Sequence, residues 1–373
     1  MEMIPLEQIT PGTQTTSVAK PGVLIDTKAL EALAEPLGKS AKMRIRQIRQ
    51  WILQRGVLDF DRMTDLPAGF RAELTEKMVP LSSRIANRQV SSDETEKLLL
   101  RMADGKEIEC VLMREENRRT ACISTQVGCG MGCVFCASGM FGVSRNLQAG
   151  EILEQLVHVR TRLKPDERLS HIVVMGMGEP MANLQNLMAA LEVACHPDGF
   201  GLSARHITIS TVGLPERIRE LADAGKKYHL AVSLHAPEEN LRTHLMPTNA
   251  KTGIQNILEA ADYFFDTTGR QVTFEYILLA GLNDGPMQAE QLGSILSHRK
   301  SHVNLIPFNP VSGLEFRRPL PDSVREFRDI LDNFGVSSTV RKRKGADISA
   351  ACGQLRREAL VENATRPLEQ VSN

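Results

Sequence analysis

The sequence predicts an α/β fold: a partial barrel of six β/α units, (βα)6, with a small N-terminal helical domain and a linking β-hairpin. Apolar residues recur at helical spacing in an early segment, and a strand-like pattern on both sides of a turn follows it. From about residue 119, strand-like runs alternate with helical ones. Such alternation implies a parallel sheet with helices outside, and six units fall short of the eight that close a barrel. Chemistry is then expected at the C-terminal ends of the strands.

The first 83 residues predict a leader followed by a helical domain. Residues 1–23, rich in Thr, Pro and Gly, are expected to form a flexible leader, and residues 24–83 a helical accessory domain. One stretch of that domain places apolar and basic residues on opposite helical faces: Ile45, Ile48, Trp51 and Ile52 against Lys42, Arg46 and Arg49. A basic face of this kind is most often a solvated surface.

The remaining segments are assigned in chain order. Residues 84–118 predict a β-hairpin extension that turns at the Ala-Asp-Gly ending in Gly105, and residues 119–357 the barrel; residues 358–373 are a tail. The six expected strands are 120–127, 171–177, 206–211, 229–235, 272–279 and 303–308. The expected helices are 149–163, 182–195, 214–224, 255–268, 287–299 and 321–334, followed by a last strand at 336–341.

Composition excludes several classes of protein. The 373 residues balance 45 basic against 45 acidic side chains, and no apolar run is long enough to cross a membrane. There is no secretory signal, so we expect a cytoplasmic protein without a membrane partner. Seven cysteines, an odd number, argue against a disulfide scaffold and favour metal binding or thiol chemistry.

Three of the seven cysteines lie in one short segment, GCGMGCVFCASG. Cys129, Cys133 and Cys136 follow the first barrel strand, and interleaved glycines allow a tight loop around whatever the thiolates hold. A structural zinc site normally needs four ligands, and no second cysteine pair follows at a suitable distance. Three thiolates without a fourth fit a 4Fe–4S cluster that leaves one iron open, which departs from the usual four-thiolate site.

Further motifs follow in a fixed order. GMGEP ends the second barrel strand, ITISTVG the third, AVSLHAP the fourth and LIPFNP the sixth, and RKGADISAACGQL stands near the C-terminus. Together with CxxxCxxC, these motifs resemble the RlmN/Cfr family of radical S-adenosylmethionine RNA methyltransferases, and most closely its RlmN branch. The resemblance runs from about residue 24 to 357. It implies that the partial barrel is a radical S-adenosylmethionine barrel.

The resemblance implies two cofactors. Cys129, Cys133 and Cys136 would ligate one 4Fe–4S cluster per chain, and two molecules of S-adenosylmethionine would be consumed per turnover. Further positions that match cofactor contacts in the family are Gly178, Glu179, Ser210, Ser233, Leu234, His235 and Asn309. A strand-end Ser, His or Asn is by itself more often a cap or turn residue, and only their convergence on one rim favours a binding role.

The resemblance also implies a covalent route. Cys352 would carry an S-methylcysteine intermediate that becomes a transient protein–RNA adduct, and Cys122 would be the resolving thiol. Small flanking residues and the basic run 341–344 support a reactive thiolate at Cys352. Glu109 matches the proton acceptor, although Glu107, Glu115 and Glu116 are nearby competitors. For the two remaining cysteines, Cys110 and Cys195, core packing is the expectation.

The implied substrates are an adenosine of 23S rRNA in the peptidyl transferase centre and the adenosine next to the anticodon of tRNA, each methylated at carbon 2. A flavodoxin-like electron donor and a monomeric state complete the expectation. Candidate phosphate contacts are Lys42, Arg46, Arg49, Arg118, Arg119, Arg317, Arg318 and residues 341–344. Two alternatives stay open: a Cfr-type enzyme that methylates carbon 8, and a non-catalytic iron–sulfur or zinc protein that binds RNA.

Overall fold

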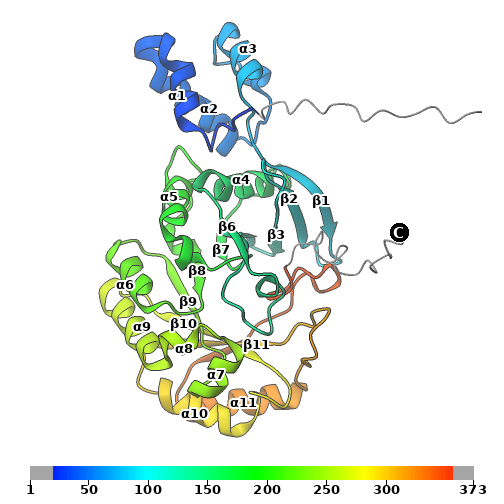
Figure 1. Cartoon of the computed structure of the whole chain (residues 1–373), viewed down its shortest axis with the longest axis vertical. Coiled ribbons are helices and arrows are strands. Elements are labelled where there is room, and N and C mark those ends of the chain that lie inside the picture. The colour runs from blue at the N-terminus through cyan, green and yellow to red at the C-terminus, as the bar shows by residue number, and fades with distance from the viewer. Residues whose placement is uncertain (1–19, 356–373) are drawn as a thin grey trace, which may run out of the picture.

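The computed structural model of the chain describes residues 20–355. A helical lobe, a set of antiparallel strands and a helix-covered partial barrel follow one another along its longest axis (Figure 1). Residues 1–19 of the predicted leader and the whole predicted tail, 358–373, lie outside the described residues.

The helical lobe contains the early segment with apolar periodicity. Its elements are α1 (Thr27–Ala34), η1 (Glu35–Ser40), α2 (Ala41–Leu53), η2 (Phe60–Arg62) and α3 (Ala68–Lys77). The carboxylate of Asp26 caps α1 by accepting from the backbone N–H of Ala29 at 2.8 Å. On α2, Ile48 and Ile52 are fully buried while Lys42 is exposed, which confirms the predicted amphipathic face.

Ten strands form one continuous sheet in the order β1-β2-β3-β4-β7-β8-β9-β10-β11-β12. The antiparallel part consists of β1 (Arg84–Val90), β2 (Glu96–Arg101), β3 (Glu107–Glu115) and β4 (Arg118–Cys122). The predicted hairpin is β2–β3, and its turn contains Gly105 in the left-handed region with φ of 79°. Strand β1 extends the hairpin at the outer edge; its polar, largely exposed residues lack the alternation that marks a strand in a sequence.

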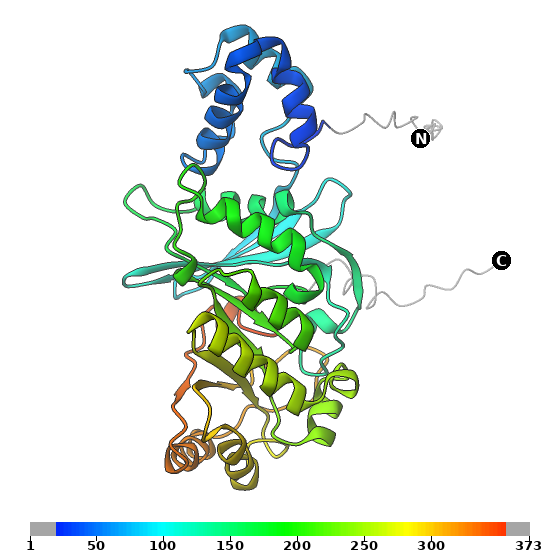
Figure 2. The same ribbon diagram turned by 90° about the vertical axis from the view of Figure 1, so that its left-hand side faces the viewer.

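From β4 onward the strands of this large sheet are parallel and alternate with helices, as predicted. The remaining large-sheet strands are β7 (His171–Val174), β8 (Ile207–Thr211), β9 (His229–Ser233), β10 (Val272–Leu278), β11 (Ser301–Pro307) and β12 (Ser338–Val340). The covering helices are α4 (Ala149–Arg160), α5 (Leu184–Cys195), α6 (Pro215–Asp223), α9 (Ile254–Thr268), α10 (Pro286–Leu296) and α11 (Pro321–Asn333). These helices lie on one face of the sheet (Figure 2).

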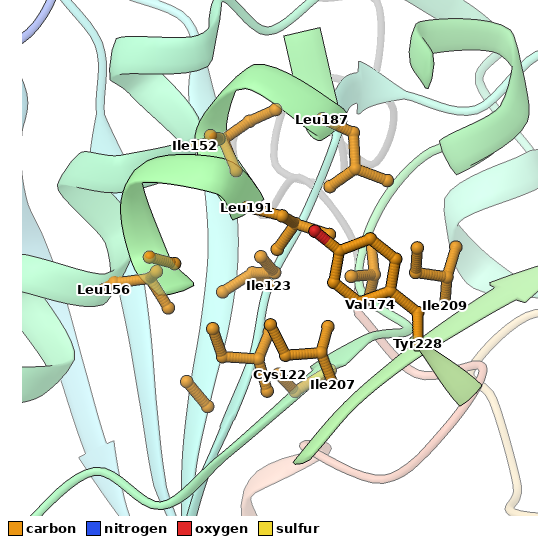
Figure 3. Close-up of a cluster of buried hydrophobic side chains, with 14 of the residues drawn as sticks. Cys122, Ile123, Ile152, Leu156, Val174, Leu187, Leu191, Ile207, Ile209 and Tyr228 are labelled. Atoms are coloured by element: carbon orange, nitrogen blue, oxygen red, sulfur yellow. The ribbon is translucent and has the colours of Figure 1, made fainter. Parts of the chain in front are cut away.

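Alternation along the parallel strands separates an apolar outer face from a polar inner one. In β8, Ile207 and Ile209 are fully buried, whereas Thr208 and Ser210 between them remain partly accessible. Figure 3 shows the outer face, where side chains of α4 and α5 pack against those of the strands. Both polar and apolar side chains line the interior of the partial barrel, and a second, smaller hydrophobic cluster that includes Phe135, Ile277 and Phe308 packs at its C-terminal end. None of the helices within residues 20–355 is long and apolar enough to cross a membrane.

Candidate active site

The three clustered cysteines lie on a compact loop at the C-terminal ends of the parallel strands. The loop joins the strands of a small antiparallel sheet, β5 (Gln126–Gly128) and β6 (Val143–Asn146). Gly128 has φ of 81°, and a Cβ there would lie 2.1 Å from the carbonyl oxygen of Gly142, so this position requires glycine. The N–H of Cys129 donates to the same carbonyl at 3.0 Å. The backbone thereby holds the thiols in place.

The thiols of Cys129, Cys133 and Cys136 line a cavity of about 150 Å³, which we call the thiol cavity. Burial raises the pKa of Cys129 to about 11 and raises the pKa values of Cys133 and Cys136; the Cys136 thiol further raises the pKa values of Cys129 and Cys133. Such thiols ionise only beside strong positive charge, and a metal centre supplies it. Within residues 20–355, no three or more His, Cys, Asp or Glu side chains are placed to hold a single ion. Three thiols on one cavity match a cluster whose irons each take one thiolate, whereas a structural zinc ion normally takes four ligands.

Glu179 brings a buried carboxylate to the thiol cavity. Its side chain accepts from the hydroxyl of Thr211 at 2.7 Å and from the N–H groups of Val212 and Met181 at 2.9 and 3.0 Å. Burial raises the pKa of Glu179, and these three donors act in the opposite direction. Gly178 before it has φ of 99°. The result is a fixed acceptor that could bind an ammonium group.

Three more of the predicted cofactor contacts reach the thiol cavity: Ser210, Ser233 and His235 line it together with Gly178 and Glu179. His235 has a positive φ of 60°, and its Nδ1 accepts from the N–H of Ile277 at 3.0 Å. Burial lowers the pKa of His235 to about 3, so the ring is neutral. The conformation is unusual for a residue other than glycine and is held by this bond.

The other two predicted contacts are placed differently. The side chain of Leu234 is fully buried in the core, and only its backbone groups engage the site, with its carbonyl accepting from Nε of Arg242 at 3.0 Å. Asn309 lies in a second cavity, where its Nδ2 donates to the carbonyl of Cys352 at 3.3 Å. The position of Asn309 supports a role in holding the loop that contains Cys352.

The second cavity, of about 370 Å³, adjoins the first, and we call it the basic cavity. Six basic residues line it: Arg118, Arg318, Arg341, Lys342, Arg343 and Lys344. Cys122 lines it as well, and Cys352 and Arg341 line both cavities. Cys352 therefore lies at the junction, which is where a group transferred from one cavity to the other would have to pass.

Arg341 faces both predicted catalytic thiols. Its pKa is raised, chiefly by the Cys352 thiol, and the buried carboxylate of Glu275 lies 4.0 Å from its Nη1. Burial raises the pKa of Cys122 to about 12; the nearby Cys352 raises it further, and Arg341 acts against both. A fixed guanidinium between two thiols favours whichever of them is ionised.

Glu109 lies beside, rather than in, the two cavities. It is fully buried on β3, and its Oε1 is 2.9 Å from Nζ of Lys97. Alternation along β3 puts it on the same sheet face as Met113 and Glu115, which do line the basic cavity. Its assignment as the proton acceptor stays a prediction, with Glu115 as the carboxylate closer to the substrate space.

The predicted phosphate contacts divide into groups. Arg118, Arg318 and residues 341–344 gather at the basic cavity, whereas Lys42, Arg46 and Arg49 line a separate groove between α2 and the end of α5. Arg119 forms an ion pair with the carboxylate of Glu167 at 2.7 Å, and its role as a phosphate contact stays a prediction.

Two site residues escaped the sequence reasoning. Glu275 and Arg242 are buried charged groups, on β10 and on α7 (Glu239–Leu245) respectively. The signal for Glu275 was a single carboxylate within the apolar strand VTFEYIL. Arg242 donates to three backbone carbonyls at the ends of β8 and β9 and to the side chain of Asn249 in α8 (Asn249–Thr252), so it fixes the strand ends that border the thiol cavity.

Comparison with known proteins agrees with this geometry. The Radical SAM superfamily matches residues 123–290, and the "Ribosomal RNA large subunit methyltransferase N-terminal domain" matches residues 24–79. A probable dual-specificity RNA methyltransferase RlmN of Rhodopirellula baltica is 54% identical over 87% of each chain, and one of Symbiobacterium thermophilum is 44% identical over 91% of each. A crystal structure of a radical SAM methyltransferase from Sphaerobacter thermophilus, 40% identical, superposes with a TM-score of 0.85 over 91% of this chain and 99% of that one. The chain belongs to the RlmN family of radical SAM methyltransferases.

Proposed function

We propose that the protein methylates carbon 2 of an adenosine in the peptidyl transferase centre of 23S rRNA and of the adenosine next to the anticodon of tRNA. The printed names of the relatives, dual-specificity RNA methyltransferases, support an RNA substrate. The observation that carries the proposal is the placement of Cys352 and Cys122. Both line the basic cavity, and Cys352 also reaches the thiol cavity.

The radical SAM superfamily implies a 4Fe–4S cluster and S-adenosylmethionine. Cys129, Cys133 and Cys136 are proposed to hold the cluster, and Glu179 to receive the ammonium of S-adenosylmethionine at the same cavity. When bound, the cofactors supply a methyl group and one-electron, hydrogen-abstracting chemistry. The proposed electron donor is flavodoxin-like.

The chain's own groups then perform the remaining work. The sulfur of Cys352 accepts a methyl group as a thiolate, with Arg341 stabilising the negative charge, and later carries the carbon that bonds to the adenine ring. Each turnover consumes two molecules of S-adenosylmethionine, since one supplies the methyl group and the second the hydrogen abstraction. The methyl carbon is thus delivered from the protein and not directly from the cofactor.

Release of the product requires a base and a second thiol. Glu109, or Glu115 at the cavity wall, takes the ring proton. Cys122, as a thiolate, then attacks the sulfur of Cys352, and the bond from Cys352 to the RNA carbon breaks. The bonding electron pair leaves with that carbon, which takes up a proton to become the methyl group, and a Cys122–Cys352 disulfide remains. A two-electron reductant must open that disulfide before the next turnover. The placement of both thiols in the lining of the basic cavity supports this exchange.

The test is an anaerobic assay. The protein, loaded with iron and sulfide, is given a reductant, S-adenosylmethionine and either 23S rRNA fragments or tRNA, and the digested nucleosides are analysed by mass spectrometry. We expect 2-methyladenosine from both RNAs. 8-Methyladenosine would assign the protein to the Cfr-type alternative, and no methylated RNA from a protein that cleaves S-adenosylmethionine would overturn the proposed substrate.

A further inference from the structure

The end of the barrel interior opposite the cysteine loop carries a group of histidines. His171 begins β7, His229 begins β9, and His206 directly precedes β8. These are the N-terminal ends of neighbouring parallel strands, so the three side chains meet at one edge. None of them was among the predicted site residues.

The histidines and one arginine form two contacting pairs. The rings of His171 and His206 are stacked, with centroids 4.5 Å apart and an interplanar angle of 23°. Nη2 of Arg270 lies 3.2 Å from Nδ1 of His229. Ser170 contributes a hydroxyl 2.9 Å from Nδ1 of His171. We call His171, His206, His229 and Arg270 the histidine rim.

Positive charge at the rim is poorly balanced. The groups whose charges act on His171 are His206, Arg118, His229 and the carboxylate of Glu115; those whose charges act on His229 are Arg270 and His206, while a backbone hydrogen bond with Arg205 acts in the opposite direction on His229. Burial and these cations lower the pKa values of His171 and His229. Because stacked imidazoles repel each other when protonated, a bound anion would allow both to take up protons.

The rim is continuous with the basic cavity. His171 pairs with Thr120 across β4 and β7, and Thr120 lines the basic cavity. Arg118 and Glu115, which face His171, line that cavity too. A strand whose target base enters the basic cavity towards Cys352 would therefore run past the rim with its backbone.

We propose that the histidine rim binds a phosphodiester of the RNA strand that adjoins the target nucleotide, and that it binds more tightly when its histidines are protonated. The inference rests on the proposed RNA substrate and adds a recognition site to it. Phosphate is the anion that this chemistry fits, because arginine and protonated imidazole both donate charge-assisted hydrogen bonds to its oxygens. The rim lies away from the reacting atoms, so it should govern RNA affinity and not the chemical step.

The test uses a His171→Gln/His206→Gln double variant of the cluster-loaded protein, because glutamine keeps hydrogen bonding and removes the titratable charge. The exposed His298 provides the control, as His298→Gln. The probe is a fluorescent RNA hairpin with one adenosine in its loop, and its Kd is measured against pH and salt. Folding is checked by thermal melting, and cluster content by absorbance.

The wild-type protein and His298→Gln should bind the hairpin about tenfold more tightly at about pH 6 than at about pH 8. The double variant should lose most of that pH dependence, and its salt slope should fall by about 0.7 for each lost phosphate contact. Its KM for RNA should rise while kcat is kept.

A folded double variant with unchanged pH dependence and salt slope would overturn the rim proposal. A wild-type protein that neither binds nor methylates any RNA would instead overturn the proposed function, so the two failures are distinguishable.

Discussion

The two cavities that meet at Cys352 differ in how they handle charge. The thiol cavity is lined by groups whose pKa values burial shifts towards the neutral form: the three loop thiols, His235, and the carboxyl groups of Glu179 and Glu275. The basic cavity is lined by six Arg and Lys side chains. The thiol cavity thus suits a cofactor that brings its own positive charge, and the basic cavity suits a polyanion.

The comparison explains why Cys352 and Arg341 stand at the junction. The Cys352 thiolate must form beside the thiol cavity, where burial opposes ionisation. Arg341, which also lines the basic cavity, supplies the compensating positive charge. The carboxylate of Glu275 lies 4.0 Å from Nη1 of Arg341 and helps to hold the guanidinium in place. Substitutions in the two cavities and at their junction test this difference in charge.

The largest effect is expected from the thiol cavity. Cys133→Ala removes a proposed cluster ligand, and we expect complete loss of cluster absorbance and of S-adenosylmethionine cleavage, whereas binding of RNA at the basic cavity persists. Cys195→Ala, at a half-buried cysteine away from both cavities, is the matched control. A variant that keeps its cluster would remove Cys133 from the ligand set.

A second prediction concerns the junction. Arg341→Met should slow alkylation of Cys352 by iodoacetamide about tenfold near neutral pH, because losing about 1.4 kcal/mol of charge stabilisation on the reacting thiolate slows the reaction tenfold. Mass spectrometry of the peptide containing Cys352 measures the rate, and Arg341→Lys should restore part of it. Equal alkylation rates in the wild type and Arg341→Met would show that the guanidinium does not stabilise the thiolate.

A third prediction separates backbone strain from packing in the cysteine loop. Gly128 and Gly105 have similar positive φ values of 81° and 79°, but only at Gly128 would a Cβ meet backbone, while nothing lies within 4 Å at Gly105. Gly105→Ala should cost about 1 kcal/mol of stability, and Gly128→Ala about 3 kcal/mol together with cluster loss. Denaturant unfolding gives both values; equal costs would contradict the close approach.

The smallest effect is a pH dependence from the thiol cavity. The pKa of His235 is lowered from 6.5 to about 3, so its contribution to stability is complete above its ordinary pKa and is lost as the pH falls towards the folded value. Between pH 6.5 and about pH 5 we expect a loss of about 2 kcal/mol that His235→Gln removes. His298→Gln should leave the loss unchanged, and an identical loss in His235→Gln would refute the assignment.

Much of the architecture could be predicted from the sequence, and the reason is periodicity. Strands such as β8 alternate apolar and polar residues, and helices such as α11 carry an apolar stripe, so their type and order follow from pattern alone. Strand β1 could not be found in this way, because an exposed edge strand places polar residues on both faces. The cysteine loop was found because three thiols at fixed spacing have few other uses.

The arrangement within the site was less predictable. Neither the junction role of Arg341 nor the contact between His171 and His206 follows from local pattern, because each depends on which strands become neighbours. Sequence spacing alone also could not separate Glu109, in its ion pair with Lys97, from Glu115 at the cavity wall. The burial of a carboxylate and its interaction partners are determined only when the chain is folded.

The most direct test of the central claim is to trap the covalent intermediate at the junction. Cys122→Ala protein, loaded with cluster and incubated anaerobically with S-adenosylmethionine, reductant and 23S rRNA fragments, is digested and analysed by mass spectrometry. We predict an RNA fragment linked through one carbon to Cys352, because the resolving thiol is missing. Free methylated RNA from this variant, with no adduct on Cys352, would contradict the account.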